Sequence, residues 1–301
     1  MNQLDQHFQK IIKKWVSIEK QGRSYAQINQ IYLLFQIYSN DKVSIEYFPF
    51  YKRYKNTIAY GAKLLNFNHI DFVYIKLFRC YPFYDTNVDV LLPKESWKDA
   101  FRILKERGWR LPNTLKRMQQ NIVEKGKIKL YPPNKRYVPL HFYETGSWRG
   151  FEYIPISVIY DNSRTIESDG VKIRIPNDEM DFLINCAHAI FENYRLTLGE
   201  LYHLGKLKEN ISIPDDIPRQ NGWTKAFKLV NEVVERFWNL NSDQELTIKL
   251  PLFLPMERLI ECWIERFNFK CRKGSVVSGY SEFITHFFWS NLIRNYKKLC
   301  Y

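Results

Sequence analysis

One run of alternating polar and apolar residues, Asn87-Val-Asp89-Val-Leu-Leu92, constrains the fold of this chain most strongly. Successive side chains on a β-strand point to opposite faces, so Asn87 and Asp89 share one face and the two valines share the other. Apolar packing gives no reason for two polar side chains to line up on a strand. The run therefore predicts a strand at 87–92 that carries chemistry on one face.

Oxygen donors at alternate positions of a strand are suited to hold divalent ions. Such residues lie ~6.6 Å apart at Cα, and nucleotidyl transfer uses two ions about 3.5–4 Å apart. Asp89 supplies a carboxylate, whereas Asn87 supplies a neutral and weaker amide oxygen. Asp85 would join them only if the chain bends at Asp85-Thr86, because a straight strand places it ~13 Å from Asp89. The alternative is that Asp85-Thr86-Asn87 only forms a turn before the strand.

Three further side chains are candidates for a site. Lys76 lies inside an apolar segment, where a charge is costly unless it reaches an edge or a cavity. It is a candidate phosphate-binding residue, and snorkelling from the strand end is the alternative. His141 and Glu144 follow another apolar segment and could supply a ligand or an acid–base group, although a hydrogen-bonded core role suits His141 as well. For His188, on an apolar helix face, packing is predicted.

Composition limits the class of protein. In 301 residues, 45 Lys and Arg exceed 32 Asp and Glu, which gives a formal net charge of +13. This excess favours a polyanionic partner such as RNA, DNA or a nucleotide, with a solvated basic surface as the alternative. None of the five cysteines forms a CxxC pair, so no zinc ribbon or disulfide framework is predicted. Without a signal pattern or a long apolar run, the expectation is a soluble cytoplasmic protein that has no membrane association.

The order of the predicted elements is typical of an α+β protein. Helices are predicted at 2–20, 24–39, 55–65, 94–107, 177–194, 197–207, 223–239, 255–267 and 281–298. Strands are predicted at 70–78, 87–92, 127–131 and 136–142, with weaker ones near 151–154 and 171–175. Pro49 argues against a helix through 41–56, and 210–222 is predicted to be a linker. We expect N-terminal helices over 1–66, a small mixed sheet over 67–176 and a helical half over 177–301.

Several of these motifs together resemble the uncharacterised nucleotidyltransferase-like family of the polymerase-β superfamily. The similarity spans roughly 60–208 and depends on the order of short motifs. They are Val73-Tyr-Ile-Lys76, Tyr81-Pro82, Asp85-Thr-Asn-Val-Asp-Val-Leu-Leu92, Gly108-Trp109, Leu140-His141, Trp148-Arg149-Gly150, Ala187-His188 and Leu198-Gly-Glu-Leu201. The resemblance implies a nucleotidyltransferase-like core with a helical segment after it.

If such a protein is active, the strand pair and its neighbours suggest roles for residues of the site. Asp89, Asn87 and Asp85 would be catalytic, and Mg²⁺ would be held by Asp89, Asp85 and Glu144. Lys76, His141 and Arg149 would bind an NTP substrate.

Two departures from the family pattern leave two alternative functions open. The family's first and third metal carboxylates fall on Asn87 and Pro139, and the Gly-Ser pair of its phosphate loop is absent after Lys76. One reading is Mg²⁺-dependent transfer of a nucleoside monophosphate to an RNA or protein acceptor. The other is an inactive nucleotidyltransferase-fold module that binds nucleic acid or a protein partner.

Overall fold

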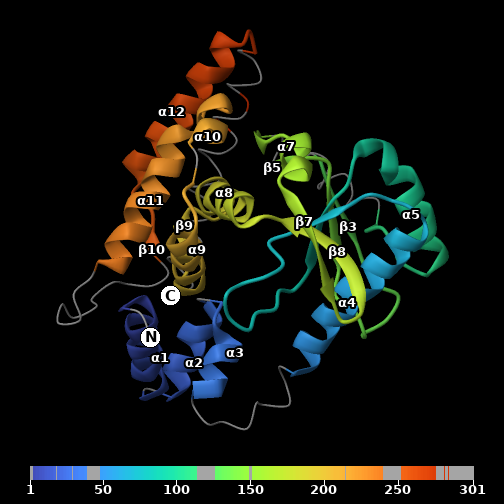
Figure 1. Cartoon of the computed structure of the whole chain (residues 1–301), viewed down its shortest axis with the longest axis horizontal. Coiled ribbons are helices and arrows are strands. Elements are labelled where there is room, and N and C mark those ends of the chain that lie inside the picture. Colours follow the sequence, from blue (N-terminus) through green and yellow to red (C-terminus); the bar gives the residue numbers. More distant parts are fainter. Residues whose placement is uncertain are drawn as a thin grey trace.

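A mixed four-stranded sheet, with helices around it and a mostly helical C-terminal part, forms the framework of the protein (Figure 1). The computed structural model describes residues 3–17, 19–28, 30–38, 48–113, 126–148, 151–213, 215–239 and 252–275, together with Ser281 and Ile284. The predicted α+β class is confirmed. No helix in the described part of the chain is long and apolar enough to cross a membrane.

The central sheet has the strand order β1-β2-β4-β3. Its strands are β1 (Val73–Ile75), β2 (Val88–Leu91), β3 (Lys127–Leu130) and β4 (Leu140–Tyr143). Strands β2 and β4 are parallel, and the other two pairings are antiparallel. A parallel pair needs a crossover connection, which here contains helix α5 (Trp97–Glu106) after a 3-10 turn at Lys94–Ser96. The register sets Asp89 beside His141.

The two faces of the sheet pack against different parts of the chain. On one face, Val88 and Val90 are buried in a core shared with helices α4 (Phe48–Phe67) and α5. On the other face, Leu91 joins a second core with the N-terminal and C-terminal helices. Because side chains alternate along β2, Asp89 points to this second face. The strand therefore carries a carboxylate into the contact between the sheet and the helical half.

The N-terminal helices pack against the C-terminal half. They are α1 (Gln3–Ser17), α2 (Glu19–Ile28) and α3 (Tyr32–Tyr38). The rings of Phe8 and Tyr202 stack with centroids 3.9 Å apart, and Lys206 forms an ion pair with Asp5 at 2.8 Å. Residues about 200 positions apart thus build one core with the sheet face described above.

Two predictions for the first third of the chain are wrong. The predicted helix 24–39 is divided in two, because Gln30 adopts a left-handed conformation (φ 60) between α2 and α3. Helix α4 begins at Phe48, upstream of the predicted start, and includes Pro49. Proline is tolerated in the first turn of a helix, where its missing N–H would have no partner in any case.

The remaining elements follow β4 along the chain, and apolar residues of β8 join the core on the first face of the sheet. They are β5 (Gly146–Trp148), β6 (Phe151–Ile154), α7 (Ile156–Asp161), β7 (Ser163–Ser168), β8 (Val171–Pro176), α8 (Asp178–His188), a π-helical segment (Ala189–Asn193), β9 (Arg195–Leu196), α9 (Leu198–Asn210), α10 (Asp216–Gln220), α11 (Thr224–Trp238), β10 (Leu252–Phe253) and α12 (Met256–Arg272). Strand β7 was not predicted, because its residues are all at least partly exposed and show no apolar alternation. Helix α10 lies in the segment predicted to be a linker. The predicted helix 281–298 lies outside the described residues apart from Ser281 and Ile284.

A buried hydroxyl joins α4 to the segment that leads into β4. Thr57 is fully buried; its Oγ1 donates to the carbonyl of Arg53 (2.9 Å) and accepts from the backbone N–H of Val138 (2.8 Å). We expect Thr57→Val to lower the free energy of unfolding by about 1–3 kcal/mol, because it leaves the Val138 N–H buried without a partner. Urea unfolding would measure the loss. Thr57→Ser, which keeps the hydroxyl, should lose less, and equal losses would contradict this explanation.

Candidate functional site

A polar cavity of about 80 Å³ lies on the second face of the sheet, where it meets the helical half. We call it the charged cavity. It is lined by Gln30, Lys76, Arg79, Asp85, Asn87, Asp89, Lys127, His141, Tyr143, His188, Glu192 and Glu200. The structure therefore brings together five of the residues predicted for the site, Lys76, Asp85, Asn87, Asp89 and His141.

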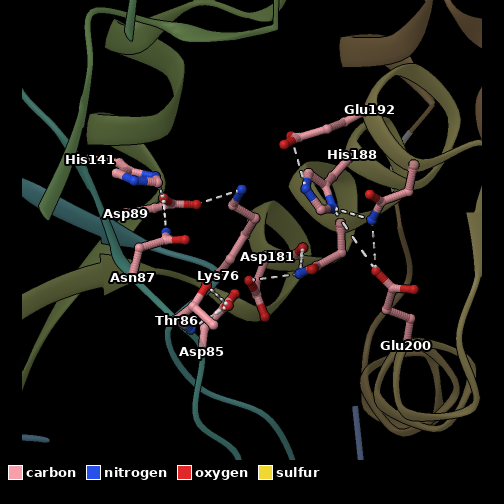
Figure 2. Close-up of polar contacts among 12 residues, drawn as sticks. Lys76, Asp85, Thr86, Asn87, Asp89, His141, Asp181, His188, Glu192 and Glu200 are labelled. Atoms are coloured by element: carbon pink, nitrogen blue, oxygen red, sulfur yellow. Dashed lines mark hydrogen bonds and ion pairs between the residues drawn. The ribbon is translucent and has the colours of Figure 1, made fainter. Parts of the chain in front are cut away.

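The Asp89 carboxylate is the centre of the contacts on the sheet side, where Lys76, Asn87 and His141 gather around it (Figure 2). Lys76 Nζ lies 2.6 Å from Asp89 Oδ2. Asn87 Nδ2 donates to Asp89 Oδ1 at 2.7 Å, and His141 Nδ1 lies 3.4 Å from the same oxygen. Asp89 is only 7% exposed, so these protein groups take the place of water around it.

The contact between Lys76 and Asp89 is an ion pair. Burial alone raises the pKa of the Asp89 carboxyl, but the Lys76 ammonium and the hydrogen bond from His141 outweigh it and hold that pKa far below its usual range. Burial alone lowers the pKa of Lys76, and the charges of Asp89 and Glu192 reverse this, so its pKa lies above the usual range. Both groups are therefore charged at neutral pH. A buried pair of this kind needs both members, since removal of one leaves the other charge uncompensated.

Lys76 reaches Asp89 through an uncommon backbone conformation. The predicted strand 70–78 places Lys76 in its interior, but β1 ends at Ile75 and Lys76 follows it with φ 56. A residue other than glycine in the left-handed region costs about 1–3 kcal/mol and persists only where the surroundings stabilise it. Such conformations are concentrated at functional sites. Because of this bend, the Lys76 ammonium lies in the charged cavity, and the residue is not part of the strand.

The wall of the cavity opposite the sheet comes from α8, the π-helical segment and α9. His188 Nε2 lies 2.8 Å from Glu192 Oε2, and His188 Nδ1 is 3.2 Å from Asn193 Nδ2. Glu200 Oε2 accepts from both the N–H and the hydroxyl of Thr197, which forms a capping box at the start of α9. The prediction that His188 only packs in the core is wrong, because its ring has polar partners and faces the cavity.

Glu192 is charged although its side chain is only 19% exposed. Burial raises its pKa, but His188 and Lys76 together bring the pKa of the Glu192 carboxyl well below its usual range. His188 and Glu192 are four residues apart, and the π-helical segment begins directly after His188. Short π-helical segments occur frequently at functional sites. The four-residue spacing of His188 and Glu192 is a local signal for the wall, since residues four apart share one face of a helix.

Asp85 lies at the rim of the charged cavity, so the chain does bend ahead of β2. Its Oδ1 accepts from the N–H of Thr86 at 2.6 Å. Local desolvation of the carboxyl and the charge of Asp89 raise the pKa of Asp85, although the residue as a whole is exposed. Asp85 thus faces the site, and the turn interpretation stays a prediction.

Of the other predicted residues, one lies away from the charged cavity and one is outside the described part of the chain. Glu144 follows β4 and pairs with Lys94, whose Nζ lies 3.0 Å from Glu144 Oε1, and it is not among the residues lining the cavity. Arg149 lies outside the described residues. The roles predicted for both stay predictions.

Arg79 is a residue of the site that sequence reasoning missed. Its Nη1 donates to Asn185 Oδ1 at 2.6 Å. Its Nε is buried and has no hydrogen-bond partner among the described residues. A charged residue three positions after Lys76, in an otherwise apolar and aromatic segment, was the available signal. An unsatisfied buried donor at a cavity indicates a place for an acceptor from outside the chain.

The donor set does not fit a bridged pair of Mg²⁺ ions. Across residues 3–275, within the ranges that the structure describes, no group of three or more His, Cys, Asp and Glu side chains could hold a metal ion. Both oxygens of Asp89 already face Lys76, Asn87 or His141. Mg²⁺ needs near-octahedral oxygen ligands, and an ammonium at 2.6 Å from Asp89 lies where such an ion would bind. We therefore derive no chemical step through a metal.

No protein-family model matches the sequence, and no curated protein matches it. The resemblance to nucleotidyltransferase-like proteins therefore stays a prediction from the sequence motifs.

Proposed function

We propose that this chain is a nucleotidyltransferase-fold protein that binds a nucleotide in the charged cavity, with the Lys76 ammonium in place of a metal ion. The observation that carries the proposal is the contact of 2.6 Å between Lys76 and Asp89. The protein would then be a nucleotide-binding module, and it would not be a metal-dependent transferase. The proposal includes a cytoplasmic location and binding of RNA, and the formal net charge of +13 supports a polyanionic partner.

The partners of the carboxylates support a phosphate ligand. Asp89 is paired with Lys76, Glu192 with His188, and Glu200 with its capping-box partner. These contacts leave the buried Nε of Arg79 as a donor that has no acceptor among the described residues. Guanidinium groups suit phosphate oxygens, because they donate charged hydrogen bonds in a planar arrangement.

Titration calorimetry with ATP would test this proposal. We expect ATP to bind as tightly in EDTA as in Mg²⁺, because Lys76 already supplies the positive charge at Asp89. Arg79→Ala should weaken binding about tenfold or more, the value of a hydrogen bond to a charged group. Lys94→Ala is the matched control, since Lys94 is exposed and pairs with Glu144 outside the cavity. Binding that needs Mg²⁺, or equal affinities in Arg79→Ala and wild type, would overturn the proposal.

Mg²⁺-dependent nucleotidyl transfer is the second candidate. One observation favours it, namely that Asp85, Asn87 and Asp89 line the same cavity. For this reaction, an incoming Mg²⁺ ion would have to displace the Lys76 ammonium from Asp89. NTP consumption by wild type and Asp89→Ala, with and without Mg²⁺, separates the candidates. Turnover that needs both Mg²⁺ and Asp89 supports the transferase, and identical rates in the two proteins exclude it.

A further inference from the structure

A second cavity, of about 230 Å³, adjoins the charged cavity. We call it the aromatic cavity. It is lined by Gln27, Gln30, Tyr32, Leu33, Pro82, Phe83, Tyr84, Asp85 and Thr86. Two of these residues, Gln30 and Asp85, also line the charged cavity, so a single ligand can extend from one to the other.

We propose that the aromatic cavity holds the base of the nucleotide whose phosphate occupies the charged cavity. This inference rests on the proposed function and names the part of the ligand that provides selectivity. The two cavities differ in the way that the two ends of a nucleotide differ: one is lined by charged groups, the other mainly by rings and apolar side chains. Aromatic side chains stack on bases of any sequence, because every base has a π-face.

Arg79 connects the two cavities. Its guanidinium carbon lies 5.3 Å from the centroid of the Phe83 ring, and the residue also lines the charged cavity. The Phe83 ring is itself fixed by edge-on contacts with Tyr54 and Tyr81, with centroids 6.3 and 6.2 Å apart. A rigid ring beside a phosphate-binding cation is a suitable surface for a base, since little side-chain freedom is lost on binding.

Gln30 supplies a polar group for the edge of the base. Its Oε1 is buried and has no hydrogen-bond partner within the described ranges. The residue is held in place by the tight turn between α2 and α3, where its N–H donates to the carbonyl of Gln27 at 3.1 Å and its φ is 60. A buried amide oxygen without a donor is unfavourable. An amino or imino N–H of a base would satisfy it, whereas a phosphate, which has acceptors only, would not.

A comparison of ATP with inorganic triphosphate tests the inference, because triphosphate has the anion without the base. We expect wild type to bind ATP at least about tenfold more tightly than triphosphate, through stacking and the Gln30 hydrogen bond. Gln30→Leu should weaken the binding of ATP about tenfold and leave the affinity for triphosphate unchanged. Gln6→Leu, the same change at an exposed position of α1, is the matched control and should alter neither affinity.

A second variant covers the case in which Gln30→Leu does not fold. Thr86→Phe changes an exposed residue that lines the aromatic cavity, and the added ring would fill part of that cavity. The variant should therefore bind ATP more weakly and triphosphate as tightly as wild type does. Equal affinities of wild type for the two ligands would overturn the base site and leave the proposed function standing. Binding of neither ligand would overturn the proposed function and this inference together. Affinity for an apolar peptide, with none for ATP, would assign the aromatic cavity to a protein partner.

Discussion

Replacing Asp89 with alanine is expected to lower the free energy of unfolding by about 3–5 kcal/mol. The physical reason is that Lys76, whose side chain is only 12% exposed, keeps its charge but loses the carboxylate 2.6 Å away. Glu192 attracts the same ammonium, but its carboxylate is already 2.8 Å from His188. Equilibrium unfolding in urea, followed by circular dichroism, would measure the change.

The double variant Lys76→Met, Asp89→Leu is the control for this result. Replacing both members of a buried ion pair with apolar residues is often neutral or stabilising, whereas removing one member is strongly destabilising. We therefore expect the double variant to be more stable than either Lys76→Met or Asp89→Ala alone. A loss of less than about 1 kcal/mol in Asp89→Ala would place the pair among exposed ion pairs and contradict its burial.

Stability is expected to fall steeply as the pH drops below about 4, the pKa range of Asp and Glu in unfolded chains. The pKa values of Asp89 and Glu192 are both held below that range in the folded protein. As the pH falls, these two groups therefore bind protons in the unfolded chain before they do so in the folded protein. In this pH range the free energy of unfolding rises with pH. Their stabilisation is fully present above the unfolded pKa values and is lost as the pH falls toward the folded ones. Urea midpoints measured from pH 7 down to pH 3 would show the loss.

Two variants separate the contributions to this acid-induced loss. In Lys76→Met, Asp89→Leu the Asp89 contribution is absent, so the fall in stability below pH 4 should be shallower than in wild type. The exposed pair of Arg164 and Asp178 provides the matched control, since an exposed pair contributes little. Asp178→Asn should therefore leave the shape of the acid limb nearly unchanged. A double variant with the wild-type acid limb would contradict the low pKa of Asp89.

The sequence allowed the sheet side of the site to be predicted, because strand periodicity is a local signal. The alternation in 87–92 predicts a strand with Asn87 and Asp89 on one face, and β2 (Val88–Leu91) has that arrangement. The apolar segment before Lys76 likewise predicted β1, although the strand is shorter than expected. In the C-terminal half, the helix predicted at 197–207 corresponds to α9 (Leu198–Asn210).

The helical side of the cavity could not be predicted, because it depends on packing between residues far apart in the chain. The contact of His188 with Glu192 is local, four residues along one helix, but only the tertiary structure turns the pair toward the sheet. Arg79 meets Asn185, more than a hundred residues later. The left-handed conformation of Lys76 also has no sequence signal, since lysine rarely adopts it and the Asp89 contact stabilises it.

A crystal structure of the wild-type protein grown with excess Mg²⁺ and ATP would test most directly that Lys76 takes the place of a metal ion. The account predicts that Lys76 Nζ stays within hydrogen-bond distance of Asp89, with the nucleotide bound and no ion between Asp89 and Asp85. An ion coordinated by both carboxylates, with Lys76 displaced toward the phosphates, would contradict it.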